Sequence, residues 1–272
     1  MRPEDDPDPV WVQRLSGYDA GATSHAIAEA QAQRRLFSHL AKEHRNEGRD
    51  SYVEIDAPLE LHALVRLLHP LHVLEVGVSS GVSSAYLLHA LDMNGEGTLH
   101  SIDLPKPSTD VPGNGRPSRV SWSLPRGRSA GGAVPFGLRK RWDLRLGNKS
   151  DVIPILTREL ARIDLVVYDV PHDDRATRGE FHLVDPRVPP GGVLIVDHGP
   201  AGGCCSALRS RAKEWGSVPV RRSGLGLYGA RRSMAGSTTP DRSGKAQGPD
   251  HRRGGSTAPS PGGGRRSGGR SR

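Results

Sequence analysis

The sequence predicts an α/β fold with a mostly parallel, seven-stranded sheet and helices on both faces. Short runs of Val, Ile and Leu, the pattern of strands buried on both faces, alternate with helical segments. The first of these runs enters a glycine-rich turn that leads directly into a helix. Two short segments near the end of the foldable chain are joined by Ser-Gly and read as a hairpin, which adds an antiparallel strand.

We expect one domain over residues 24–230, between a loose acidic N-terminus, residues 1–23, and a disordered tail, residues 231–272. The tail is Gly, Ser, Pro and Arg, a composition that cannot bury enough apolar surface to fold. It holds ten Lys or Arg and two Asp, a net charge of +8, which equals that of the whole chain. The rest of the chain is therefore neutral, which argues against nucleic acid as a partner.

Several classes of protein are excluded by simple features of the sequence. The two cysteines, Cys204 and Cys205, are adjacent, which rules out a disulfide framework or a cysteine zinc site. The first residues lack the basic and apolar regions of a signal peptide, and no apolar run approaches membrane-spanning length. We expect a soluble cytoplasmic protein without membrane contact. The sequence allows a homodimer but does not predict one.

Two helices are expected before the first strand, within residues 24–68. Apolar residues recur near helical spacing from Ser24, a candidate cap, to about Glu43. Pro58 opens a second helix over 58–68. Both helices are expected to cover the sheet or its ligand site.

The remaining elements follow in alternation. The expected strands are 72–78, 98–104, 142–147, 163–169, 193–199, 217–222 and 225–229, and the expected helices are 82–92, one beginning near 152, 174–184 and 203–215. Residues 105–141 are rich in Pro, Gly and Arg and show no clear period. A loop of this length in a compact domain is often functional, so we interpret it as an insert over the ligand pocket, with a plain surface loop as the alternative.

The glycine-rich turn carries the most specific motif. Glu75, Gly77 and Gly81 give E-x-G-x-x-x-G, whereas a dinucleotide site usually shows G-x-G-x-x-G. Such a turn brings bare backbone N–H groups close to a ligand above the strand end. The pattern resembles motif I of the class I S-adenosylmethionine (AdoMet)-dependent methyltransferases, which have a Rossmann-like domain. A βα turn in some other α/β protein is the alternative.

The resemblance implies a set of cofactor contacts. Glu75, the loop residues Gly77, Ser79 and Gly81, and the serine that follows at Ser83 would hold the methionyl part.

Asp103 lies at the end of the second expected strand, about twenty residues past the loop. A carboxylate there can accept hydrogen bonds from both ribose hydroxyls, a position shared by nucleotide-binding α/β folds. The alternative is a loop aspartate that caps a turn.

A second segment strengthens the resemblance. Residues 147–156 resemble the G-x-S-x-D-x-x-P-x-L segment of small-molecule O-methyltransferases, whose loop lies along the adenine. The implied adenine contacts are Ser150 and the backbone of Asn148 and Lys149, although Lys149 stands where the family has serine. Pro-Gly-Gly before the fifth strand is another habit of the family, and the resemblance covers about 58–230.

Four polar residues follow the fourth and fifth expected strands: Asp169, His172, Asp197 and His198. Ligands collect at this edge of a parallel sheet, and carboxylates with imidazoles can hold a divalent cation. Metal-dependent O-methyltransferases carry an aspartate after strand four and an acidic pair or Asp-Asn after strand five. The family resembling macrocin O-methyltransferase shows D-x-x-H, with the histidine as base.

The resemblance therefore implies His172 as a base with Asp169, and Asp169, Asp197 and His198 as ligands of magnesium or manganese. His198 departs from the family pattern, and imidazole suits manganese better than magnesium. The alternatives are a strand-end aspartate beside the cofactor, a helix-capping histidine and a solvent-facing histidine.

We therefore expect an AdoMet-dependent methyltransferase that acts on a small-molecule acceptor, at a hydroxyl oxygen. One alternative is a non-catalytic protein that keeps the fold to bind a partner. The joint presence of the motif residues and Asp103 argues against it. The other alternative is an RNA methyltransferase that uses the basic tail, against which the neutral folded part argues.

Overall fold

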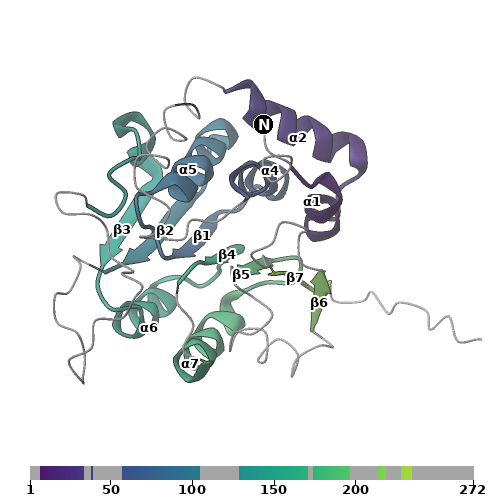
Figure 1. The fold of residues 1–272 in the computed structure, drawn as a ribbon. Coiled ribbons are helices and arrows are strands. Elements are labelled where there is room, and N and C mark those ends of the chain that lie inside the picture. Colours follow the sequence, from purple (N-terminus) through teal and green to yellow (C-terminus); the bar gives the residue numbers. More distant parts are fainter. Residues whose placement is uncertain are drawn as a thin grey trace, which may run out of the picture. The chain divides into compact units, whose positions relative to one another are not determined.

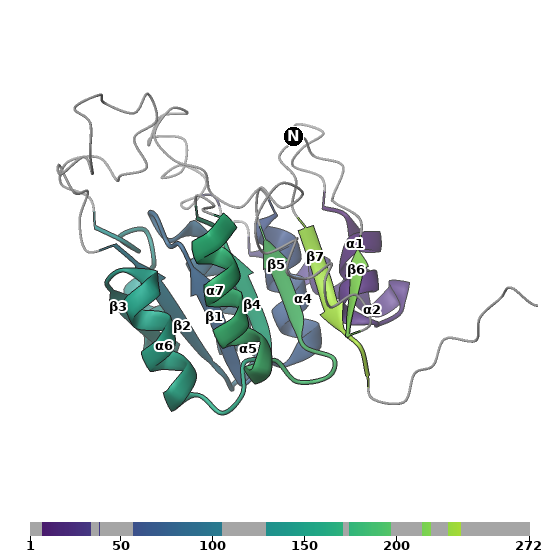
Figure 2. The ribbon, with the colours of Figure 1, turned by 90° about the horizontal axis from the view of Figure 1, so that it is seen from below.

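The computed structural model describes residues 7–33, 38, 57–104, 129–170, 174–196, 214–218 and 228–234. All of them belong to one compact unit, Met1–Gly236. Its centre is a seven-stranded sheet with the order β3-β2-β1-β4-β5-β7-β6. The strands are β1 His72–Val76, β2 Thr98–Asp103, β3 Trp142–Leu146, β4 Leu165–Tyr168, β5 Val193–Val196, β6 Trp215–Val218 and β7 Tyr228–Arg232 (Figures 1 and 2).

The sheet is mostly parallel, as predicted. β1 lies between β2 and β4, and both pairings are parallel. Among the described strands, β7 alone runs opposite to all the others, and it pairs antiparallel with β5 and with β6. The expected α/β class is thus confirmed, and the carboxyl ends of β1, β2 and β4 meet at one edge of the sheet.

Helices cover both faces of the sheet (Figure 2). One face carries α1 Pro9–Ser16, α2 Ala20–Ala32, α4 Pro58–Leu68 and α5 Val82–Asn94, and the other carries α6 Lys149–Glu159 and α7 Asp174–Val184. The 3-10 helices η2 Phe136–Arg141 and η3 Asp185–Arg187 complete the described elements. Each face has its own apolar core, which is why the strands contain buried Val and Leu at successive positions.

The N-terminus differs from the expectation of a loose segment. Residues 9–16 form α1, whose Trp11, Val12 and Leu15 are buried. Asp8 caps this helix by accepting a hydrogen bond from the Trp11 N–H, and Pro9 is its first residue. A cap followed by proline is a helix-start signal, which the acidic and Pro-rich composition of the segment hides. The cap of α2 is likewise Asp19 and not Ser24.

The C-terminal boundary also differs. β7 continues to Arg232, two residues past the expected end of the domain. Arg232 donates hydrogen bonds to the carbonyl oxygens of Asp185 and Val188, which fasten β7 to the loop before β5. The helix expected over 203–215 lies outside the described residues except at its end, where Trp215 begins β6.

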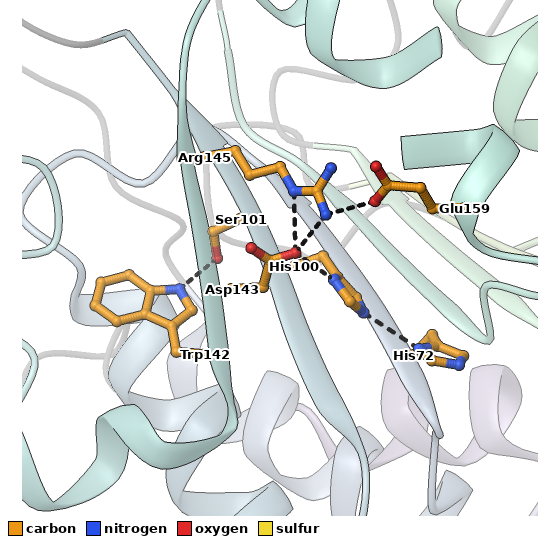
Figure 3. Close-up of polar contacts among 7 residues, drawn as sticks. All are labelled: His72, His100, Ser101, Trp142, Asp143, Arg145 and Glu159. Carbon is orange, nitrogen blue, oxygen red and sulfur yellow. Dashed lines mark hydrogen bonds and ion pairs between the residues drawn. The ribbon is translucent and has the colours of Figure 1, made fainter. Parts of the chain in front are cut away.

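The edge strand β3 is held by polar contacts on the α6 face (Figure 3). The ring nitrogens of His72 and His100 lie 3.2 Å apart, and His100 lies 3.0 Å from Asp143. Arg145 bonds Asp143 and reaches Glu159 of α6 at 2.6 Å. Burial would raise the pKa of Asp143, but hydrogen bonds from Arg145 and His100 outweigh it and lower that pKa. The chain of contacts joins three strands to one helix.

No helix in the described part of the chain is both long and apolar enough to cross a membrane.

Candidate functional site

The loop between β1 and α5, which we call the glycine loop (residues 77–81), has an unusual backbone. Gly77, Ser79 and Gly81 have φ of 95°, 50° and 94°, all in the left-handed region. A Cβ at Gly77 would lie 1.8 Å from the carbonyl oxygen of Asp169, because the ends of β1 and β4 are in close contact there. The loop therefore needs glycine at position 77 for both its conformation and its space.

Gly81 is enclosed from another direction. A Cβ there would lie 2.7 Å from the Cα of Gly131 and 2.8 Å from a methyl carbon of Val134. Both belong to residues 129–135, which we call the covering segment. Its Gly131 N–H donates to the Ser79 carbonyl, and its Ala133 N–H donates to the Ser80 carbonyl, each at 2.9 Å. The end of the expected insert is thus docked on the glycine loop.

Glu75 lies fully buried in β1, beneath the glycine loop. Its carboxylate accepts hydrogen bonds from the hydroxyls of Ser83 at 2.7 Å, Ser84 at 2.6 Å and Ser101 at 2.7 Å. Burial raises the pKa of Glu75 to about 7, although the three hydroxyls act against this rise. Glu75 therefore joins the first turn of α5 to β2, and its side chain supports the loop from below.

Asp103 ends β2 beside the glycine loop. Its Oδ2 accepts hydrogen bonds from the N–H groups of Val78 at 3.1 Å and Ser79 at 2.8 Å, and its Oδ1 accepts from Leu104 at 2.6 Å. The carboxylate thus stands where the sequence expects the ribose contact. It also ties the loop to β2, the turn-capping role that was the alternative.

The hydroxyl of Ser79 is the main unsatisfied group in this loop. Its oxygen is buried and has no hydrogen-bond partner among the described residues. A buried polar atom without a partner costs about 1–3 kcal/mol, and Ser79 also has an unfavourable φ. Such costs at one residue are typical of a loop that a ligand completes, so the loop fits a bound cofactor with polar groups.

In the predicted adenine segment after β3, the side chains make contacts with α6 and α7. Asn148 caps α6 by accepting from the Ser150 N–H. Lys149 donates to Glu180 of α7 at 2.8 Å, and the Ser150 hydroxyl donates to the same carboxylate at 3.1 Å. Adenine contacts from this loop would therefore come from its backbone, and these three residues stay predictions.

Of the predicted catalytic and metal residues, the structure describes Asp169 alone. It directly follows β4, and its N–H donates to the Val76 carbonyl at 2.8 Å, next to Gly77. His172, Asp197 and His198 lie outside the described residues. Within the ranges that are described, no group of three His, Cys, Asp or Glu could hold a metal ion. The base and the metal site remain predictions.

The structure also brings in residues that sequence reasoning missed: Ser84, Ser101, Gly131 and Trp142. Ser101 pairs with Glu75 in the parallel register of β1 and β2. A serine within an apolar strand, opposite a glutamate, was a usable signal, because buried polar groups need partners. Trp142 and Gly131 gave no such signal, since their contacts depend on where the covering segment docks.

Comparisons with known proteins agree with the overall fold. Residues 74–198 match a family model described as a methyltransferase domain. The O-methyltransferase TomG from Streptomyces achromogenes is 18% identical, with a TM-score of 0.50, over 78% of this chain and 96% of that chain. A methyltransferase from Geobacter sulfurreducens is 15% identical, with a TM-score of 0.50, over 74% of this chain and 89% of that chain. No curated protein sequence matches the chain. At these identities the solved structures show a shared fold.

Proposed function

We propose, from the match of residues 74–198 to the methyltransferase domain model, that the chain transfers a methyl group from AdoMet to a hydroxyl oxygen of a small molecule. The glycine loop carries the proposal. Its two left-handed glycines, its buried unpaired Ser79 hydroxyl and the adjacent Asp103 carboxylate make a cradle for a ligand with an amino-acid head and a ribose. The TomG structure is described as a complex with SAM, which is another abbreviation for AdoMet, and this supports the choice of cofactor.

The residues of the cradle have separate tasks in this proposal. The loop backbone, with the hydroxyls of Ser79 and Ser83, holds the methionyl part, and Asp103 holds the ribose. The backbone of Asn148 and Lys149 borders the adenine. When bound, AdoMet supplies a methyl group on a positively charged sulfur. The protein then has to align the acceptor oxygen, exclude water and remove the hydroxyl proton.

We assign proton removal to the residues that follow β4. Asp169 lies against Gly77, at the edge of the cradle. His172 follows it three residues later in the sequence. We assign His172 as the base and Asp169 as its partner in the acceptor pocket.

A cation would explain a second feature of the sequence. Tyr168 and Val196 are paired in the register of β4 and β5, so Asp169 and Asp197 follow paired positions. Two carboxylates at neighbouring strand ends repel each other unless a positive charge lies between them. Magnesium or manganese held by Asp169, Asp197 and His198 is our proposal for that charge.

The function is tested by methyl transfer. Purified protein is incubated with AdoMet that carries a tritium-labelled methyl group, together with small hydroxyl compounds or with bulk RNA. Label in the small compounds supports the proposal, and label in RNA alone supports the RNA methyltransferase reading.

A truncation tests the alternative in which the basic tail has a function. The structure shows that the cut belongs after Gly236, because a cut at 230 would remove Arg231 and Arg232 from β7. The shortened protein should keep its activity on small acceptors. Loss of activity would instead favour a working role for the tail.

A further inference from the structure

Trp142, the first residue of β3, contacts both the core beneath the glycine loop and the covering segment above it. Its indole N–H donates to the Ser101 hydroxyl at 2.8 Å, on the face of the sheet opposite His100 and Asp143 (Figure 3). Its ring fills the space beside Gly131, where a Cβ would lie 2.0 Å from a ring carbon. Trp142 therefore touches the residue whose N–H binds the Ser79 carbonyl.

Ser101 connects Trp142 to the glycine loop through hydrogen bonds. A hydroxyl has one proton, and because the indole can only donate, Ser101 accepts from Trp142 and keeps its proton for another partner. That proton goes to Glu75, 2.7 Å away. Glu75 in turn fixes Ser83 and Ser84 in the first turn of α5. A continuous hydrogen-bonded chain thus runs from Trp142 to the helix that starts at the glycine loop.

The covering segment is fastened to Trp142 by a second group. The Arg139 guanidinium lies over the indole ring, 5.8 Å from its centroid. The same guanidinium donates to the Val134 carbonyl at 3.1 Å and 2.9 Å. Val134 is the residue whose methyl group closes the space beside Gly81. The ring, the arginine and the segment therefore form one packed unit against the loop.

We propose that Trp142 is a positioning residue for the cofactor loop. Its N–H orients Ser101 and Glu75 below the loop, and its ring seats the covering segment on the other side. With both sides fixed, the loop is ordered before the ligand arrives, which lowers the entropic cost of binding. The inference rests on the proposed function, because the ligand in question is AdoMet or its product, S-adenosylhomocysteine.

The test compares two conservative tryptophan variants by calorimetry with S-adenosylhomocysteine. Trp142→Phe keeps an aromatic side chain but removes the N–H and the outer ring carbons that lie beside Gly131. The matched control is Trp215→Phe, whose indole N–H donates to Asp185 at 2.9 Å on the other face of the sheet. We expect Trp142→Phe to weaken binding about fivefold, the factor that an ordinary hydrogen bond provides. The control should bind within about twofold of the wild type.

A double-mutant cycle checks the route through Ser101. Because part of the effect of Trp142 passes through that hydroxyl, Trp142→Phe should weaken binding by a smaller factor in a Ser101→Ala background than in the wild type. Full additivity of the two losses, or equal affinity of Trp142→Phe and the wild type, would overturn the inference and leave the proposed function standing. A wild type that binds no S-adenosylhomocysteine removes both.

Hydrogen exchange without ligand provides a second readout. The N–H groups of Gly131 and Ala133 are protected only while the covering segment is docked on Ser79 and Ser80. Trp142→Phe should speed exchange in peptides that contain residues 129–135, whereas Trp215→Phe should not. Unchanged exchange in Trp142→Phe would contradict the positioning role.

Discussion

The carbonyl oxygen of Asp169 occupies the space that a side chain at Gly77 would need, 1.8 Å from the ideal Cβ position. Alanine at position 77 must therefore displace backbone, in addition to adopting a left-handed φ. Gly95 is a matched control, since its φ is also left-handed and no described atom lies within 4 Å of its Cβ position. Gly95→Ala should cost about 1 kcal/mol of stability.

We predict that Gly77→Ala costs several times more than Gly95→Ala and abolishes binding of S-adenosylhomocysteine. Urea unfolding measures the first effect, and calorimetry on the folded fraction measures the second. Equal stability of the two variants would show that the strand ends do not approach as the structure has them.

Glu75 gives a prediction on pH. Burial raises its pKa to about 7 in the folded protein, while an unfolded glutamate titrates near 4.3. Between these values the folded state binds more protons than the unfolded state, so the contribution of Glu75 to stability falls as pH rises. Glu75→Gln should remove this dependence. The difference in unfolding free energy between wild type and variant should change by about 3 kcal/mol from pH 4.5 to pH 8.

The measurement for Glu75 is chemical unfolding at a series of pH values. A constant difference between wild type and Glu75→Gln across this range would mean that the carboxyl is not buried as described.

His62 gives a dependence of stability on pH that has the opposite sign to that of Glu75. It is fully buried between α4 and α5, with its Nε2 3.0 Å from the His89 Nδ1. Burial, then the neighbouring His89 and Arg66, lower the pKa of His62 to about 3. An unfolded histidine takes up a proton near pH 6.5, so the contribution of His62 is present above that pH and is lost as pH falls toward 3.

We predict that His62→Gln flattens the loss of stability on the acid side, by up to about 1.4 kcal/mol per pH unit between pH 6 and pH 4. Thermal unfolding across this range measures the effect. An unaltered slope in His62→Gln would contradict the burial of a neutral imidazole.

The proposed chemistry gives a prediction on metal and base. If the cation is present, EDTA should abolish turnover, and Asp197→Ala should lose the metal while it still binds AdoMet. His172→Ala should slow turnover by about 10²–10⁴-fold, the scale of general base catalysis. Full activity in EDTA after removal of trace metal would end the argument for a cation, whatever the histidine variant does.

The sequence predicted the layers and the glycine loop because both depend on local patterns. Strand periodicity and the spacing of Gly77 and Gly81 are visible in a few residues. The docking of residues 129–135 depends on contacts with Ser79 and Trp142 from distant parts of the chain. The motif also does not predict that Glu75 is buried beneath the loop, because the motif identifies the residue but not the direction of its side chain.

The proposed function requires that the glycine loop bind AdoMet. The most direct measurement is a calorimetric titration of the full chain with S-adenosylhomocysteine, with NAD as the comparison ligand and Asp103→Ala as the variant. We expect a dissociation constant in the micromolar range for the wild type, no heat with NAD, and at least about tenfold weaker binding in Asp103→Ala, because a charged hydrogen-bonding partner is lost. Heat with NAD alone, or an affinity for S-adenosylhomocysteine unchanged in Asp103→Ala, would contradict AdoMet binding at this loop.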